Sequence, residues 1–324
     1  MNRRVLLQWL ASLAAWRSLA VHAARTPRVG YLFSFPRAEG EHLWQACRAG
    51  LRELGYVEGR NIIVEPRWAD GDYKRLPGLV QELLALKVDV LVTAATPPSR
   101  AAMAATKTTP IVFVAVGEPI AVGLVKSMAR PGGNITGLSL LTSELSGRRL
   151  KLLVDCVGKA NTVAVIRNPS NRVHETFLAE SRAAAGALGL QIASLDAAGP
   201  DDIERAFDAA RAMKADAAIV FDDPVLWSHR KRFVALAAKS RLPVMYGYRE
   251  FVDEGGLISL GPDRIEHYRR TAIYVDRILK GAKPAELPVE QPLKFQLVIN
   301  IKSANALGLK VPERLLLAAD EVIK

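Results

Sequence analysis

The sequence predicts an α/β protein made of two lobes, each a parallel β-sheet covered by helices on both faces. Short runs rich in Val and Ile alternate with amphipathic runs, a pattern typical of parallel strands buried on both faces. The pattern occurs twice with the same spacing: 55 − 28 and 189 − 162 both equal 27, counted from the first strand to the Leu-Gly that ends the first helix. Such a Leu-Gly is a common helix stop. We therefore expect two Rossmann-like βα lobes.

The first half contains apolar runs of strand length separated by helical patterns. The expected strands are 28–34, 61–67, 88–93, 111–116 and 134–140. The expected helices are 41–54, 76–86, 99–107 and 120–128. A turn, Pro131-Gly132-Gly133, precedes the fifth strand. A long helix over 143–157 then leads away from this half.

The second half repeats the alternation. Its expected strands are 162–168, 190–195, 216–222, 243–246 and 257–261. Its expected helices are 172–188, 200–213, 228–239 and 264–279, the last ended by Gly281 and Pro284. A final strand over 295–301 and a short helix over 302–307 complete the chain.

Composition limits the class of protein. The 324 residues are 50% hydrophobic and 24% charged, which supports a full core and argues against disorder. Two cysteines are too few for a disulfide scaffold or a cysteine-built zinc cluster. The net charge of +11 is spread without a block of five like charges, so a solvated surface is favoured over nucleic-acid binding.

The N-terminus has the pattern of an export signal. Arg3 and Arg4 give a basic start, Val5 to Ala15 is mostly apolar, and Val21-His22-Ala23 has the small-residue spacing of a cleavage site. Arg17 interrupts the apolar run well short of a membrane span, which disfavours the alternative of an N-terminal anchor. We therefore expect a signal peptide over 1–23, export by the general or the twin-arginine route, and a mature charge of 11 − 3 = +8.

The common catalytic and cofactor motifs are missing from the sequence. It contains no G-x-G-x-x-G, G-x-x-x-x-G-K-[ST], H-E-x-x-H or C-x-x-C. The stretch from Gly137 to Leu141 begins like a nucleophile elbow but lacks the final glycine. We expect no cofactor, no metal and no catalytic residue, and a periplasmic enzyme is the less favoured alternative.

Polar and turn-forming residues follow six of the expected strands, three in each half. Carboxyl ends of parallel strands line ligand clefts, and helix N-termini there attract anionic groups, although the same residue types also serve as ordinary helix caps. The candidate ligand-binding residues are Ser34, Phe35, Thr96, Pro97, Ser99, Gly117, Glu118, Asn168, Asp222, Asp223, Tyr246, Arg249 and Glu250.

Some of these residues have an expected role. Thr96 or Ser99 would donate to a ligand carboxylate beside Pro97-Pro98, and Asp222 or Asp223 would accept from a ligand ammonium with help from Glu118. The alternative for Arg249 and Glu250 is that they pair with each other and brace the region between the lobes.

Several stretches together resemble one family. They are GLRELGYVEGRN (50–61), RWADG (67–71), PGGNITG (131–137), Tyr246 with REF (249–251), ILKGAKP (278–284) and FQLVIN (295–300). Across essentially the whole mature chain the sequence resembles ABC-transporter substrate-binding proteins of the tryptophan/tyrosine-binding type, which have the type I periplasmic binding protein fold.

The resemblance implies a monomeric periplasmic receptor that captures an amino acid or an aromatic or other organic acid by hinge closure of its lobes. It would deliver this small-molecule solute to an ABC permease in the inner membrane. A ligand sensor without a transport role is the alternative. A sugar-type transcriptional regulator is disfavoured, because the first strand begins at Arg28 and leaves no room for a helix-turn-helix.

The resemblance also implies a three-segment hinge, with crossings between lobes near 140–145, 260–265 and 284–292. The expected first lobe is 24–142 plus 288–324, and the second is 143–287. On this reading the third crossing returns the final strand, 295–301, to the first lobe.

Overall fold

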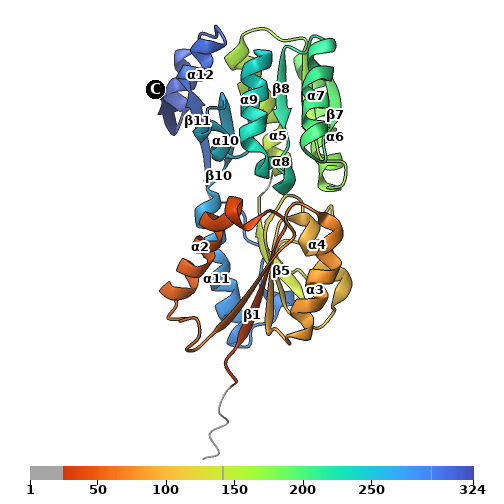
Figure 1. Ribbon diagram of the computed structural model, residues 1–324, viewed down its shortest axis with the longest axis vertical. Helices are drawn as coiled ribbons and strands as arrows, with labels where there is room; N and C mark the ends of the chain where they lie inside the picture. The colour runs from red at the N-terminus through yellow and green to blue at the C-terminus, as the bar shows by residue number, and fades with distance from the viewer. Residues whose placement is uncertain (1–24, 141, 293) are drawn as a thin grey trace, which may run out of the picture.

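The computed structural model describes residues 25–140, 142–292 and 294–324, and the expected signal peptide, 1–23, lies outside them. The chain forms two α/β lobes that follow one another along the longest axis of the molecule (Figure 1). None of the described helices is long and apolar enough to cross a membrane.

The first lobe is built on a five-stranded sheet in the order β2-β1-β3-β4-β5, with every neighbouring pair parallel. Its Val- and Ile-rich inner strands are buried because helices cover both faces. Helices α3 and α4 lie on one side and α2 with α11 on the other (Figure 1). The strands are β1 (Arg28–Phe33), β2 (Ile63–Trp68), β3 (Val90–Ala94), β4 (Ile111–Val116) and β5 (Ile135–Ser139). The helices are α2 (Arg37–Glu53), α3 (Leu76–Ala85), α4 (Thr96–Ala105) and α11 (Arg264–Leu279), with the 3-10 turns η2 (Tyr73–Arg75) and η3 (Pro284–Glu286).

The second lobe is built on a seven-stranded sheet in the order β12-β11-β10-β9-β8-β6-β7. All neighbours are parallel except β10 and β11, which are antiparallel. The strands are β6 (Thr162–Arg167), β7 (Gln191–Asp196), β8 (Ala217–Val220), β9 (Val244–Tyr246), β10 (Ile258–Pro262), β11 (Phe295–Asn300) and β12 (Glu321–Ile323). The helices are α5 (Thr142–Val157), α6 (Val173–Leu188), α7 (Pro200–Ala212), α8 (Pro224–Ser228), α9 (Arg230–Ser240), α10 (Arg249–Asp253), α12 (Ile301–Ala306) and α13 (Glu313–Ala318).

The chain crosses between the lobes three times; the first two crossings lie where the resemblance implies them, and the third follows Glu290, at the end of the expected region 284–292. The crossings lie between β5 and α5, between β10 and α11, and between Glu290, which bridges to Leu138 of the first lobe, and β11. We call these three segments the hinge.

The placement of the final strand in the first lobe is wrong. β11 pairs with β10 of the second lobe, and Figure 1 shows the C-terminus there. Three crossings necessarily leave the chain in the lobe opposite to the one in which it starts. The first lobe is therefore 25–140 plus 264–290, and the second is 142–262 plus 295–324.

Helix α11 belongs to the first lobe because it packs closely on α2. A Cβ on Gly50 of α2 would lie 2.1 Å from the backbone oxygen of Arg269, so the two backbones touch where glycine provides no side chain. Sequence periodicity identifies the helix but not the lobe on which it packs.

The helix expected over 120–128 does not form. Gly123 has a φ of 73°, which is left-handed, and Leu124 N donates to the oxygen of Pro119. A left-handed residue ends a right-handed helix, so β4 and β5 are joined by a loop.

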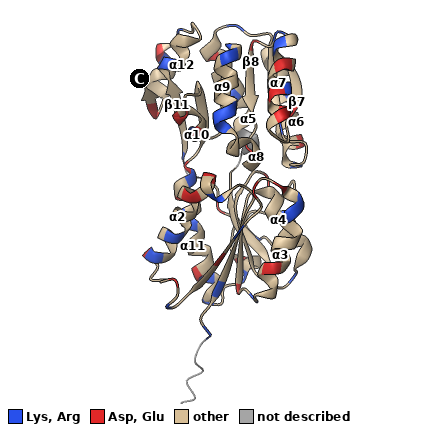
Figure 2. Cartoon of the chain, viewed as in Figure 1, with Lys and Arg blue, Asp and Glu red and all other residues tan. Residues whose placement is uncertain are grey.

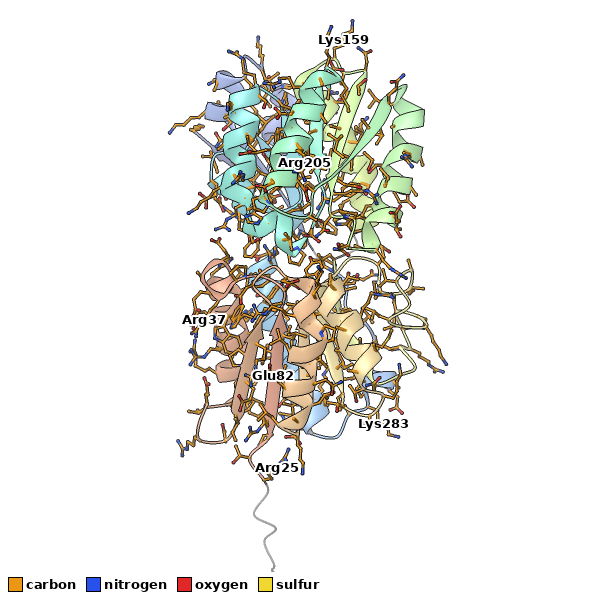
Figure 3. All side chains as sticks on the ribbon, turned by 45° about the vertical axis from the view of Figure 1, so that its right-hand side comes forward. Arg25, Arg37, Glu82, Lys159, Arg205 and Lys283 are labelled. Atoms are coloured by element: carbon orange, nitrogen blue, oxygen red, sulfur yellow. The ribbon has the colours of Figure 1, made fainter. Side chains whose placement is uncertain are left out.

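Charged side chains cover both lobes without a single-signed face in the view of Figure 2. Figure 3 shows Arg25 and Lys283 at the far end of the first lobe, and Lys159 at the far end of the second. This distribution agrees with the expectation that the excess of Lys and Arg over Asp and Glu is spread over a solvated surface.

Candidate interlobe binding site

A small pocket lies between the lobes at the carboxyl ends of β3, β4, β5 and β8. Its cavity volume is about 10 Å³, the space of about one water molecule, so a solute can enter only when the lobes move apart. The first lobe contributes Ala95, Thr96, Ala115, Gly117 and Leu140, and the second contributes Asn171, Val173, Phe177, Asp222, Pro224 and Tyr248. The position matches the rule that ligands bind outside the carboxyl ends of parallel strands.

The first-lobe wall is made mainly of backbone. Ala95 and Ala115 have φ values of 82° and 59°, unusual for residues other than glycine and typical of functional sites. Thr96 opens α4, so the N-terminus of this ten-residue helix lies at the pocket. Since the next two residues are prolines, the Thr96 N–H and hydroxyl are the polar groups nearest that end.

Ser99 supports this wall and does not line the pocket. It is fully buried, its Oγ donates to the Ala95 oxygen at 2.7 Å, and it lies 2.9 Å from Thr93 Oγ1. These bonds hold the turn in which Ala95 has its positive φ. The hydroxyl is therefore used within the first lobe.

The second-lobe wall carries a buried charge pair. Arg149 Nη2 donates to Asp222 Oδ2 at 2.9 Å, and Arg149 Nε donates to the Leu260 oxygen at 2.8 Å. Both side chains of the pair are 2% exposed. Asp222 Oδ1 is buried and has no hydrogen-bond partner among the described residues. A buried carboxylate oxygen without a partner is costly, so Asp222 is the strongest candidate to contact a ligand cation.

The neighbouring Asp223 has a different role. Its Oδ1 accepts from the N–H groups of Val225 and Leu226 and caps α8. It also accepts from Asn168 Nδ2, and its Oδ2 accepts from Asn171 Nδ2 and from Tyr73 OH. Asp223 is therefore saturated by five donors and does not line the pocket.

The bond from Tyr73 to Asp223 joins the two lobes. Its donor lies in η2 of the first lobe, 2.9 Å from Asp223 Oδ2 of the second. Burial, followed by the negative charge of Asp223, raises the pKa of Tyr73 well above its ordinary value. The phenol therefore stays a neutral donor across the physiological range.

Aromatic side chains also meet across the interface. The Phe35 ring of the first lobe lies edge-on to that of Trp227 in α8, with 5.1 Å between centroids. Ser34, just before it, is fully buried and its Oγ has no partner among the described residues. Phe35 therefore lies in the interface, and neither residue lines the pocket.

Glu250 lies at the hinge and pairs across it. Arg264, the first residue of α11, donates to Glu250 Oε1 at 2.9 Å, and His42 Nε2 of α2 lies 3.7 Å from the same oxygen. Burial alone would raise the pKa of Glu250, but the charge of Arg264 and the nearby His42 imidazole lower it to about 2. The Arg264 guanidinium also lies over the rings of Trp227 and Tyr248.

Arg249 lies outside the pocket. It pairs with Asp253 and with Glu321 of β12, and its side chain is 39% exposed. The suggested pairing between Arg249 and Glu250 is wrong, because each has other partners.

The structure thus gives the candidate residues different places. Thr96, Gly117 and Asp222 line the pocket. Pro97 lies beside it, on a groove that Tyr73, Thr96 and Asn171 also line. Ser99, Asn168, Asp223 and Glu250 hold neighbouring groups in place. Glu118 is half-buried after β4 and is not among the lining residues, and Tyr246 lines a different cavity.

Sequence reasoning missed Arg149, Asn171, Phe177 and Tyr248 as parts of the site. One signal for Arg149 is available: it stands four residues after Leu145 and four before Leu153, on the apolar face of α5. A charge on a buried helix face requires a buried partner. Among the described residues, no group of three or more His, Cys, Asp or Glu is arranged to hold a metal.

The chain is similar to known proteins over most of its length. Residues 41–323 match the family described as ABC transporter substrate binding protein. A tyrosine-binding protein of Clostridioides difficile is 25% identical over 260 residues, which cover 80% of this chain and 74% of that protein.

Two solved structures are similar over the whole fold. A conserved domain protein of Vibrio cholerae has a TM-score of 0.87 and 29% identity, covering 92% of this chain and 100% of that one. An ABC domain of Streptococcus pneumoniae in complex with L-Trp has a TM-score of 0.85 and 27% identity, with the same coverage. The fold is that of type I periplasmic binding proteins.

Proposed function

The chain belongs to the family of ABC transporter substrate-binding proteins, and from this premise we propose that its interlobe pocket binds one amino acid with an apolar or aromatic side chain. The observation that carries the proposal is the position of two opposite electrostatic ends in one small pocket. The N-terminus of α4 is at the first-lobe wall, and Asp222 is at the second-lobe wall, where its Oδ1 lies against Gly247 without a hydrogen-bond partner among the described residues.

Each end fits one charge of an amino acid. The Thr96 N–H and hydroxyl, with the helix dipole behind them, would hold the carboxylate. Asp222 Oδ1 and the unpartnered Asn171 Oδ1 would accept from the ammonium. Arg149 acts as a positioning residue, because its bond to Oδ2 leaves Oδ1 for the ligand.

The remaining walls are apolar and favour an apolar side chain. Leu140, Val173, Phe177 and Pro224 surround the pocket, and Tyr248 adds an aromatic ring. Relatives described as tyrosine-binding or solved with L-Trp support aromatic amino acids as the first candidates.

We propose further that the protein is exported by the signal at 1–23 and acts as a periplasmic monomer. Ligand capture would close the lobes about the hinge. Contacts such as Tyr73 to Asp223 would stabilise the closed arrangement that an ABC permease receives.

Isothermal titration calorimetry on the chain beginning at Ala24 tests whether the ligand must carry both the carboxylate and the ammonium of an amino acid. L-tryptophan and L-tyrosine are compared with tryptamine, which lacks the carboxylate, and indole-3-acetate, which lacks the ammonium. We expect only the amino acids to bind tightly. Equal affinity for indole-3-acetate would contradict the role of Asp222, and equal affinity for tryptamine would contradict the role of the α4 N-terminus.

Two variants then test the residue proposed for each charged group of the amino acid. Asp222→Asn should weaken amino-acid binding about ten- to a hundredfold, since a hydrogen bond to a charged group contributes about 1.5–3 kcal/mol. Thr96→Val, which keeps the shape and removes only the hydroxyl, provides a second variant that leaves the buried charge pair intact. Asp253→Asn, on the outer face of the second lobe, is the matched control. Parent-like affinity in folded Asp222→Asn and Thr96→Val would refute the site.

A further inference from the structure

His174 lies behind the second-lobe wall of the pocket, in the first turn of α6. Its side chain is fully buried and contacts two loops that follow neighbouring parallel strands, β6 and β8. The loop after β6 contains Asn168 and Asn171, and the loop after β8 contains Asp222. Since Asn171 and Asp222 line the pocket, the imidazole stands where it can hold both of these loops in place.

Hydrogen bonds to the two loops fix the tautomer of this ring. The Asn168 N–H donates to His174 Nδ1 at 3.0 Å, so Nδ1 carries no proton. The proton is then on Nε2, which donates to the backbone oxygen of Asp222 at 3.2 Å. The opposite tautomer and the imidazolium each set a proton on Nδ1 against the Asn168 N–H. Only the neutral Nε2–H form therefore makes both bonds.

The backbone groups held by His174 belong to residues that build the wall. The carbonyl that it binds is in Asp222, the residue whose carboxylate is proposed to accept from the ligand ammonium. Asn168 also donates from its side chain to Asp223, which caps α8. The His174 ring lies 5.7 Å from that of Phe177, a lining residue of the pocket. A displaced imidazole would therefore move polar and apolar parts of the wall together.

We propose that His174, as the neutral Nε2–H imidazole, is a positioning residue for ligand binding, which holds Asp222 and the loop of Asn168 and Asn171 in place for the ligand. The ring acts through these loops, because it lies behind them and does not line the pocket. Residues that lock a binding group in its productive geometry contribute to affinity without touching the ligand. The inference about affinity rests on the proposed function, whereas the hold on the loops does not.

Protonation of His174 would break this arrangement. The charged groups around the ring, on α5, α6, β6, β7 and the loop after β8, are Arg149, Glu175, Arg167, Asp196, Asp222 and Asp223. Burial lowers the pKa of the imidazole, the charges of Asp223 and Asp222 and the bond to the Asp222 carbonyl raise it, and the charge of Arg167 lowers it. Burial prevails, so the pKa falls below its ordinary value of 6.5 and the neutral form dominates at neutral pH.

The first test examines the ring and the loop without any ligand. Nitrogen NMR of the chain beginning at Ala24 should show His174 as the Nε2–H tautomer at neutral pH, with its signal assigned by its loss in His174→Phe. The Asn168 amide should exchange slowly with solvent in the parent. It should exchange about tenfold faster or more in His174→Phe, which keeps a ring but has no acceptor. The Nδ1–H tautomer, or equal exchange in the two proteins, would overturn the proposal.

The second test separates positioning from packing by calorimetry with L-tryptophan. His174→Phe keeps the shape of the ring but loses both hydrogen bonds, so it should weaken binding about tenfold. His174→Gln loses the ring but keeps a donor for the Asp222 carbonyl, so it should weaken binding less, by roughly threefold. His229→Phe makes the same change at a half-buried imidazole without a hydrogen bond among the described residues, and it should bind like the parent. If His174→Phe binds like the parent, or better than His174→Gln, the ring acts only by packing.

The pH dependence of affinity gives a third readout, which needs no substitution in the parent. Affinity for L-tryptophan should follow the neutral fraction of His174 measured by NMR, and should therefore fall as pH decreases through the pKa of the ring in the folded chain. This fall should be absent in His174→Gln, and the same fall in both proteins would refute the role of His174. If the parent binds neither L-tryptophan nor L-tyrosine, the proposed ligand is wrong, and exchange of the Asn168 amide still decides whether His174 holds the loops.

Discussion

Arg149–Asp222 and Arg264–Glu250 are both buried arginine–carboxylate pairs with a closest distance of 2.9 Å, but they lie in different regions of the molecule. The first lies within the second lobe, where both side chains are 2% exposed. The second lies at the hinge, where the exposures are 6% and 18% and His42 of the first lobe approaches the carboxylate.

The difference shows two uses of the same ion pair. Arg149 and Asp222 both belong to the second lobe, so movement between the lobes leaves their pair intact and a carboxylate oxygen available. Arg264 and Glu250 stand on opposite sides of a crossing, with Trp227 and Tyr248 against the guanidinium. That pair depends on how the lobes meet. One pair builds the pocket wall, and the other joins the lobes.

The largest expected effect comes from Arg149→Met. It leaves the Asp222 carboxylate buried without a counter-charge, which should lower the free energy of unfolding by about 3–5 kcal/mol. Urea denaturation measures the loss. Arg148→Met, at the exposed neighbouring position, is the control and should change stability by less than about 0.5 kcal/mol. Similar losses in the two variants would show that the Arg149 pair does not organise the second-lobe wall.

An intermediate effect is expected from acid at the hinge pair. The pKa of Glu250 falls from its ordinary value of 4.5 to about 2 in the folded chain. Between these values the unfolded chain binds the proton and the folded chain does not, so stability falls as pH decreases. From pH 5 to pH 3 the parent should lose about 2 kcal/mol from this group.

Glu250→Gln removes that contribution, so its stability should fall less steeply over the same pH interval. Glu53→Gln, at an exposed pair on α2, should follow the parent. Urea midpoints at pH 5, 4 and 3 give the three slopes. Parallel slopes for the parent and Glu250→Gln would contradict the hinge pair as the source of acid sensitivity.

The smallest effect is expected from Arg249→Ala. Its pairs with Asp253 and Glu321 lie at the surface, where ion pairs contribute about 0–1 kcal/mol. Stability should change by less than about 0.5 kcal/mol, and amino-acid affinity should not change. A loss of affinity by calorimetry would return Arg249 to the site and weaken the contrast between buried and exposed pairs.

The strands and most helices follow from the alternation of apolar runs, because each run reflects local burial. The lobe that receives α11 and β11 depends instead on contacts between distant segments, such as Gly50 against α11. Strand and helix periods carry no information on that pairing.

The site could be predicted in part for the same reason. Thr96, Gly117 and Asp222 follow strands, and strand ends meet at the cleft. Asp222 and Asp223 are indistinguishable by that rule, yet Asp223-Pro224 is a helix-start signature that identifies Asp223 as a cap. Arg249 comes three residues after β9 and Asp222 two residues after β8, but Arg249 starts α10 and pairs at the surface.

The three crossings also govern when each lobe is complete during synthesis. The first lobe includes α11 and Glu290, and the second closes its sheet with β11 and β12, the last strands of the chain. Neither lobe is therefore one continuous segment that folds as it emerges. Pairing of such distant residues makes folding slow. The nascent chain consequently leaves the edge of β10 unpaired until β11 is available, and an unpaired strand edge favours aggregation.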